Sequence, residues 1–214
     1  MDQSLKGKGI FITFEGNECA GKSTQIKLLG QYLEGKGKVV KVIREPGGTP
    51  LGEEIRELVK KKRTEPVYVE ADLCLFQAAR AQLVKSVIQP ALSAGEIVIC
   101  DRFYDSTWVY QGWVGGINLM AIDFVNKLVT PGIHIDQTFL LELPVTRILE
   151  RLSIRAGIDR FEARGEDYFV KVNEGYAQLK KEAARRVTGI NADRPQEEIQ
   201  KDIQICVDKL LASH

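Results

Sequence analysis

The chain has 214 residues, of which 44% are hydrophobic and 28% are charged, and its formal net charge is +1. This length suits one domain with a full core, and the near-zero charge argues against a broad basic surface for nucleic acid or an anionic membrane. Four widely spaced cysteines without a CxxC pair, a polar N-terminus and the lack of a bilayer-spanning apolar run predict a cytoplasmic protein without disulfides, structural zinc or a signal peptide.

Short apolar runs rich in β-branched residues alternate with longer helical patterns. Strands are predicted at 10–14, 39–43, 97–100 and 138–143, with a weaker one at 187–190. Helices are predicted at 22–34, 51–61, 71–94, 119–129, 144–154, 167–185 and 195–211. Pro90 is expected to bend or end its helix, because it has no amide hydrogen. The alternation predicts a parallel sheet with helices on both faces, a three-layer α/β/α fold whose ligands bind beyond the carboxyl ends of the strands.

The segment after the first strand matches the phosphate-binding sequence GxxxxGK[ST] in full. It consists of Gly16, Asn17, Glu18, Cys19, Ala20, Gly21, Lys22, Ser23 and Thr24, which are predicted to bind ATP. Its glycines allow a tight turn that aims backbone amides at phosphates, and the following helix adds its N-terminal dipole. Lys22 is predicted to reach the β- and γ-phosphates, and Ser23 to bind Mg²⁺. The motif alone does not choose among GTPases, transporter ATPases and small kinases, although an NKxD guanine motif is missing from the sequence.

Charged residues also follow the second and third predicted strands. Asp101 stands where a P-loop protein holds its metal, often through water, and Arg102 next to it would put a cation beside a phosphate. Arg44 begins the turn 44–49, whose proline and paired glycines specify a tight conformation. Each feature has a plainer interpretation, namely a surface Asp–Arg pair and an ordinary turn between a strand and a helix.

Five segments taken together resemble bacterial thymidylate kinase. They are FEGNECAGKSTQ, REPGGT, LFQAAR, DRF with STWVYQG, and a later DRFE, and the resemblance runs from about Gly9 to the C-terminal helix. It implies one P-loop kinase domain over residues 1–214, with a mostly five-stranded parallel sheet and an arginine-bearing lid at about 151–164. It also implies transfer of the γ-phosphoryl group of ATP to dTMP with Mg²⁺, in the dTTP synthesis pathway, by a cytoplasmic homodimer.

The resemblance assigns residues to the acceptor nucleotide. Glu18 corresponds to a carboxylate near the sugar, and Arg44 to an arginine near the acceptor phosphate. Phe76 corresponds to the phenylalanine that stacks on the base, and Arg80 to the arginine at the pyrimidine edge. These two are four residues apart and would share one face of a helix, although core packing is the plainer interpretation of a lone phenylalanine.

The DRF and YQG segments supply further positions. Asp101 and Arg102 match the family's DR motif, which implies metal binding by Asp101 and a catalytic, phosphate-binding role for Arg102. Thr107 matches a position that faces the base. Tyr110 matches an aromatic residue that crowds out a ribose 2′-hydroxyl, with Gln111 beside it as a further substrate contact.

Arginines of the lid complete the predicted machinery. The resemblance assigns catalysis to Arg155 and Arg160, beside Lys22 and Arg102, whereas a solvated helix is the better interpretation of Arg151 and Arg164. Some family members carry an arginine in the P-loop at the position of Cys19, so its absence here makes a lid cation more necessary. The surrounding amides and Lys22 are also expected to favour the thiolate form of Cys19.

Two other functions stay open. The first is a kinase for another nucleoside monophosphate, which Phe76, Arg80 and the YQG segment disfavour for purines but less so for dUMP. The second is a nucleotide-gated switch or assembly ATPase without a small acceptor, which the acceptor-side motifs disfavour.

Overall fold

A single parallel sheet organises the chain in this computed structural model, which describes residues 9–155, 157 and 159–213. Its strands are β1 Ile10–Glu15, β2 Val40–Arg44, β3 Ile97–Asp101, β4 Gln137–Glu142 and β5 Val187–Asn191. Their order is β2-β3-β1-β4-β5, and every neighbouring pair is parallel. The predicted strands are thus confirmed, including the weak fifth one, and so is the α/β fold.

The central position of β1 in the sheet accounts for its apolar sequence. β1 lies between β3 and β4 and is buried along its whole length, which is why its residues are almost all apolar. Its one internal polar side chain, Thr13, is satisfied by the hydroxyl of Thr138 on β4 at 2.8 Å. Glu15 ends the strand with a fully buried carboxyl group.

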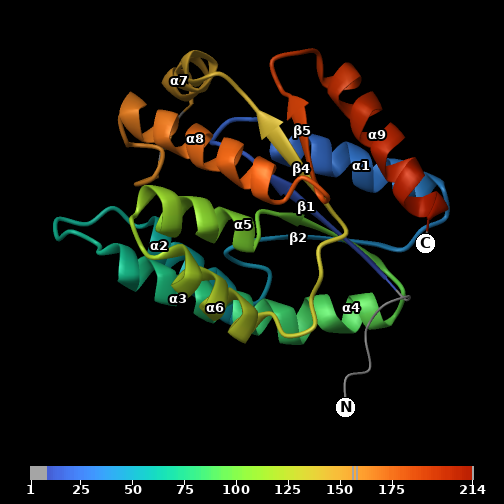
Figure 1. Ribbon diagram of the computed structural model, residues 1–214, viewed down its shortest axis with the longest axis horizontal. Coiled ribbons are helices and arrows are strands. Elements are labelled where there is room, and N and C mark those ends of the chain that lie inside the picture. Colours follow the sequence, from blue (N-terminus) through green and yellow to red (C-terminus); the bar gives the residue numbers. More distant parts are fainter. Residues whose placement is uncertain (1–8, 156, 158, 214) are drawn as a thin grey trace.

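Helices cover both faces of the sheet. They are α1 Lys22–Gly35, α2 Pro50–Lys60, α3 Val69–Leu83, α4 Gln89–Ser93, α5 Tyr104–Thr107, α6 Leu119–Val129, α7 Val145–Ser153, α8 Glu166–Glu182 and α9 Gln196–Ala212. Residues of α1, α7 and α9 pack on one face of the central strands, and α3, α4, α6 and α8 pack on the other. Figure 1 shows α1 and α9 on the side of the sheet opposite α3, α4 and α6.

Two π-helical segments were not foreseen. Val84–Ile88 forms η1 between α3 and α4, so the predicted helix 71–94 continues past Pro90 with a change of hydrogen bonding. Pro90 comes just after this π-helical segment and does not end the helix as expected, since Ile88 and Gln89 before it keep right-handed helical φ and ψ. Trp108–Val114 forms η2 directly after α5, within a segment that had no predicted helix. In the described part of the chain, no helix is long and apolar enough to span a membrane.

Candidate active site

The carboxyl ends of β1, β2 and β3 open into a cavity of about 380 Å³. Its walls come from the P-loop, the turn after β2, helices α2 and α3, the segment after β3 and the lid. Most of the predicted site residues line it: Glu18, Cys19, Ala20, Gly21, Lys22, Ser23, Thr24, Arg44, Phe76, Arg80, Asp101, Arg102, Thr107, Tyr110, Gln111 and Arg155. Gly16, Asn17 and Arg160 are the predicted residues that do not.

The P-loop takes the conformation that its glycines predict. Gly16 has a φ of +132°, and a Cβ there would come within 2.4 Å of the Leu141 carbonyl oxygen. Lys22 begins α1 and folds back over the loop, where its ammonium group donates to the carbonyl oxygens of Gly16 and Asn17 at 3.2 and 2.9 Å. Burial and the neighbouring Arg102 lower the pKa of Lys22. An anion that displaced these carbonyl contacts would therefore meet a poorly solvated cation.

Asn17 connects the P-loop to α8. Its side-chain amide donates to the Phe169 carbonyl oxygen and to Asn173 Oδ1, at 2.9 and 3.0 Å, and its own Oδ1 accepts from the amide of Glu18. Asn17 is almost fully buried, so its side chain ties the loop to α8 and does not face the cavity.

The expected thiolate character of Cys19 is wrong. Burial raises the pKa of its thiol, and the guanidinium of Arg155, 4.0 Å from Sγ, only partly opposes that effect. Desolvation of the thiol thus outweighs the nearby cation. Cys19 has a φ of +56°, a left-handed conformation that glycine adopts more readily.

Asp101 and Ser23 meet at the phosphate end of the cavity. The hydroxyl of Ser23 at the start of α1 donates to Asp101 Oδ2 at 3.0 Å. Mg²⁺ prefers oxygen ligands and keeps several waters, so one hydroxyl and one carboxylate fit its requirements. The described residues hold no group of three or more His, Cys, Asp or Glu side chains that would form an all-protein metal cage.

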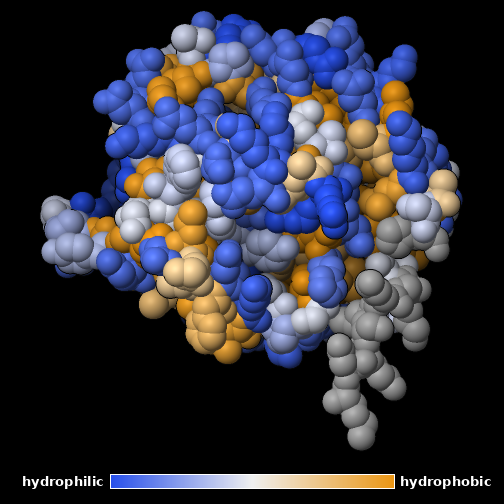
Figure 2. All heavy atoms as spheres, in the orientation of Figure 1, coloured by the Kyte–Doolittle hydropathy of each residue, from blue (hydrophilic) through white to orange (hydrophobic). Residues whose placement is uncertain are grey.

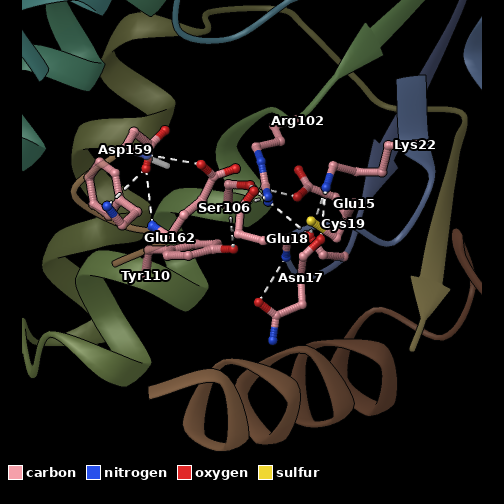
Figure 3. Close-up of polar contacts among 12 residues, drawn as sticks. Glu15, Asn17, Glu18, Cys19, Lys22, Arg102, Ser106, Tyr110, Asp159 and Glu162 are labelled. Carbon is pink, nitrogen blue, oxygen red and sulfur yellow. Dashed lines mark hydrogen bonds and ion pairs between the residues drawn. The ribbon is translucent and has the colours of Figure 1, made fainter. Parts of the chain in front are cut away.

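Arg102 occupies the centre of the cavity floor. Its φ of +69° turns the chain sharply after β3 and brings the guanidinium under the P-loop. There Nη2 forms an ion pair with Glu18 Oε1 at 2.7 Å, and the guanidinium lies 5.3 Å from the centre of the Tyr110 ring. Figure 3 shows these side chains converging from separate elements. Although burial works to raise the pKa of Glu18, Arg102 and Lys22 outweigh it and hold that pKa below its ordinary value.

Phe76 and Arg80 of α3 form the opposite end of the cavity. Phe76 is half-buried and packs against a small cluster that contains Ile55 and Val59 of α2, so it serves the core while it faces the cavity. Arg80 is 2% exposed and pairs with Glu45, and its Nη1 donates to Thr107 Oγ1 at 2.9 Å. The structure thus joins α3, the turn after β2 and α5 in a single wall.

The lid bends over this wall. Between α7 and α8, residues 154 and 160–163 form turns and Gly157 has a φ of +74°, while residues 156 and 158 of the predicted lid lie outside the described residues. Arg155 extends to the P-loop and pairs with Glu162, and Phe161 lies 6.2 Å from Phe76, ring centre to ring centre. The lid therefore touches both ends of the cavity.

Comparisons with known proteins agree with this geometry. Residues 14–203 match the family model described as thymidylate kinase. The thymidylate kinase of Teredinibacter turnerae is 42% identical, with 95% of this chain and 99% of that protein covered, and the one of Methylococcus capsulatus is 42% identical, with 96% and 98% covered. The crystal structure of thymidylate kinase from Ehrlichia chaffeensis is 30% identical and superposes with a TM-score of 0.76, covering 94% of this chain and 99% of that one. The chain belongs to the thymidylate kinase family.

This membership confirms the resemblance, the fold and the predicted enzyme class, a nucleoside monophosphate kinase. For Arg160, the contacts differ from those of a phosphate ligand: Nε donates to the Val59 carbonyl oxygen at 2.6 Å, and the guanidinium pairs with Asp72 of α3. In this conformation Arg160 fastens the lid to α2 and α3.

Several residues of this site were not predicted from the sequence. Arg56 of α2 lines the cavity, and its Nη1 donates to the Pro46 carbonyl oxygen at 2.9 Å. Burial and the nearby Arg44 lower the pKa of Arg56. Glu45 lies next to Arg44 in the REPGGT segment, and Phe161 lies next to Arg160 in the DRFE segment. These neighbouring positions were the sequence signal that could have identified both residues. No sequence signal indicated a role for Arg56, because a charged residue on an amphipathic helix is ordinarily solvated.

Proposed function

We propose that this protein transfers the γ-phosphoryl group of ATP to dTMP, giving dTDP in the dTTP synthesis pathway. The observation that carries the proposal is one cavity with two chemically different ends. Lys22 and Ser23 of the P-loop lie at one end, and Phe76 and Arg80 lie at the other, with Arg102 in the cavity floor. An anion-binding end facing an aromatic and arginine-bearing wall suits a triphosphate donor and a base-bearing acceptor.

On the donor side, the amides of the P-loop and the N-terminus of α1 would hold the phosphates of ATP. The predicted ATP-binding set is residues 16–24, of which Glu18 to Thr24 line the cavity and Gly16 and Asn17 shape the loop. Lys22 would exchange its two carbonyl contacts for phosphate oxygens. Ser23 and Asp101 would hold Mg²⁺, Asp101 through water. When bound, that ion supplies positive charge that offsets the negative charge on the phosphates.

On the acceptor side, Arg102 and Arg44 would bind the phosphate of dTMP. Arg44 now pairs with Glu53 at 2.8 Å at the exposed rim, so this contact must open or be shared when an anion arrives. Glu18, which the ion pair with Arg102 holds in place, would contact the sugar of dTMP. Tyr110, which lies against Arg102 and within 3.4 Å of Glu18, would fill the space that a ribose 2′-hydroxyl needs.

The base would stack on Phe76, with Arg80, Thr107 and Gln111 at its polar edge. Arg80 donates strongly, and carbonyl oxygens are the acceptors that a pyrimidine such as thymine presents. Gln111 is buried in η2 and lines the cavity. Its amide offers both a donor and acceptors, which suits a base edge with N–H and carbonyl groups.

Phosphoryl transfer needs no strong general base here, because the attacking group is already an anionic phosphate. The protein's contribution is to position the two phosphates in line and to neutralise charge. Lys22 and Arg102 would act from the floor, and Arg155 from the lid. A docked lid would also exclude water and limit wasteful hydrolysis.

We also infer that the protein is a homodimer in the cytoplasm. The α6 helix exposes Met120, Phe124 and Leu128, which are four residues apart and so share one face. Figure 2 shows this face as an orange patch, and contiguous exposed apolar surface of this kind marks interaction sites. Sedimentation of the wild type as a monomer would contradict the dimer, and Phe124→Glu is expected to dissociate it. The four free cysteines suit a reducing compartment.

The kinase proposal is tested by coupled measurement of ADP release with ATP, Mg²⁺ and a panel of nucleoside monophosphates. Turnover is expected to be highest with dTMP, lower with dUMP and very low with purine nucleotides. A purine as the best acceptor would support the first alternative, a kinase for another monophosphate. ATP hydrolysis that no acceptor accelerates would support the second, a nucleotide-gated switch.

A further inference from the structure

Glu15, at the carboxyl end of β1, is a buried carboxylate for which the proposed mechanism has no role. It is 0% exposed and does not line the cavity. Its Oε1 accepts a hydrogen bond from the amide of Phe103 at 2.8 Å. Its Oε2 accepts from the hydroxyls of Ser106 and Tyr176 at 2.7 and 2.8 Å. Glu15 therefore joins β1, the segment after β3, and α8.

These contacts determine how the two hydroxyls face Arg102. Each hydroxyl has one proton, and the ionised form of Glu15 can only accept, so in that form both protons turn to Glu15, although the two hydroxyl oxygens also lie 3.1 Å from each other. The lone pairs of Ser106 Oγ and Tyr176 Oη are then free to accept from Arg102 Nη1, at 3.3 and 3.1 Å. The Gly16 carbonyl oxygen accepts from the same nitrogen at 2.9 Å.

Glu15 also fixes the backbone that carries Arg102. The left-handed φ of +69° at Arg102 is uncommon for a residue with a side chain and needs support from its surroundings. Hydrogen bonds on both sides of the turn supply it. The Arg102 amide donates to the Phe14 carbonyl oxygen at 2.9 Å, and the next amide, that of Phe103, donates to Glu15.

We propose that Glu15 is a positioning residue that holds Arg102 in place for the acceptor phosphate. It acts through the hydroxyls of Ser106 and Tyr176 and through the turn at Phe103, and Figure 3 shows Glu15 and Ser106 grouped around the Arg102 side chain. The inference rests on the proposed function, because it takes Arg102 to be the cation that binds the phosphate of dTMP. Burial and the nearby Asp105 raise the pKa of Glu15 to about 7, and the ionised form that orders the two hydroxyls prevails above that pH.

A double-mutant cycle tests the proposal with the full-length enzyme. Glu15→Gln keeps the shape of the side chain but puts an NH2 group in place of one oxygen. Either the hydroxyls of Ser106 and Tyr176 or the amide of Phe103 then lose their acceptor. The expected loss in kcat/KM for dTMP is about 10- to 100-fold, mainly through KM for dTMP, with KM for ATP changed less than about threefold. In the Arg102→Ala background, Glu15→Gln is expected to lower kcat/KM no further.

Multiplying losses in the double variant, or equal losses toward ATP and dTMP, would overturn the proposal. Should Glu15→Gln fail to fold, the same cycle with Tyr176→Phe decides, because that variant removes only one hydroxyl of the network. Tyr32→Phe is the matched control, since its hydroxyl donates to Asp208 at 2.7 Å, between α1 and α9. Turnover of dTMP by the wild type, measured first, tests the proposed function separately.

Discussion

The ion pair between Arg80 and Glu45 supports the acceptor wall, and removing one partner is expected to destabilise the fold. Both side chains are almost fully buried. Nε and Nη2 of Arg80 lie 2.8 and 2.7 Å from Glu45 Oε2, and Nη1 donates to Thr107 and Asn126 at 2.9 and 3.0 Å. Within the described residues, Glu45 Oε1 has no hydrogen-bond partner, so Arg80 is the main compensation for this buried charge.

Arg80→Leu leaves Glu45 buried without its cation, and breaking a pair of this kind typically costs about 3–5 kcal/mol. The double variant Arg80→Leu/Glu45→Leu removes both charges and is expected to recover most of that loss, because apolar residues often replace a buried pair at little cost. Both variants are expected to lose affinity for dTMP. Stability and base binding at this wall are therefore separable.

Urea unfolding at several pH values measures this effect. Burial already raises the pKa of Glu45, with Arg80 acting against it. Without Arg80 that pKa rises further, so the folded state of the single variant binds a proton more tightly than the unfolded chain does. The single variant should thus be less destabilised at pH 5 than at pH 8. A loss below about 1 kcal/mol at neutral pH, or a double variant no more stable than the single one, would show that Arg80 does not offset the buried charge of Glu45.

Three further outcomes follow from the site. The pKa of Glu15 in the folded protein is about 7 and its ordinary value is 4.5, so its contribution to stability is greatest below pH 4.5 and declines as pH rises to about 7. Glu15→Gln should remove that decline from thermal unfolding measured at pH 5 and pH 8. An unchanged difference in stability between the two pH values would contradict this expectation. Arg155→Ala should lower kcat by about 10³-fold while the unfolding midpoint stays nearly constant, and an unchanged kcat would rule out the lid cation. Asp72→Asn weakens the pair with Arg160, so ATP hydrolysis without acceptor should rise relative to transfer, as measured by phosphate release; an unchanged ratio would show that this pair does not hold the lid.

The sequence predicts the parts of this protein that depend on local patterns. The P-loop, the five strands and the charged strand ends were recognisable because each is a short segment with its own spacing and turn chemistry. The strand ends then converge because parallel strands present their carboxyl ends at one edge of the sheet. The cavity that collects Lys22, Arg102 and Phe76 follows from this topology.

Local patterns do not predict contacts between segments that lie far apart in the sequence. Glu15 and Tyr176 are 161 positions apart, and no pattern in either segment indicates their hydrogen bond. The lid shows the same limit, since Arg155 and Arg160 lie in the same predicted lid segment, about 151–164, yet have different contacts, one with the P-loop and one with α3. The direction in which a loop arginine points is set by the surface on which the loop docks.

The fate of the γ-phosphoryl group distinguishes its transfer to dTMP from hydrolysis of ATP. ATP labelled with ¹⁸O in that group is incubated with dTMP, Mg²⁺ and the full-length protein, and the products are read by mass spectrometry. Transfer to dTMP predicts that the label appears in the β-phosphoryl group of dTDP, at a rate that depends on dTMP and falls strongly in Arg102→Ala. Label recovered only in inorganic phosphate, at a rate indifferent to dTMP, would contradict it.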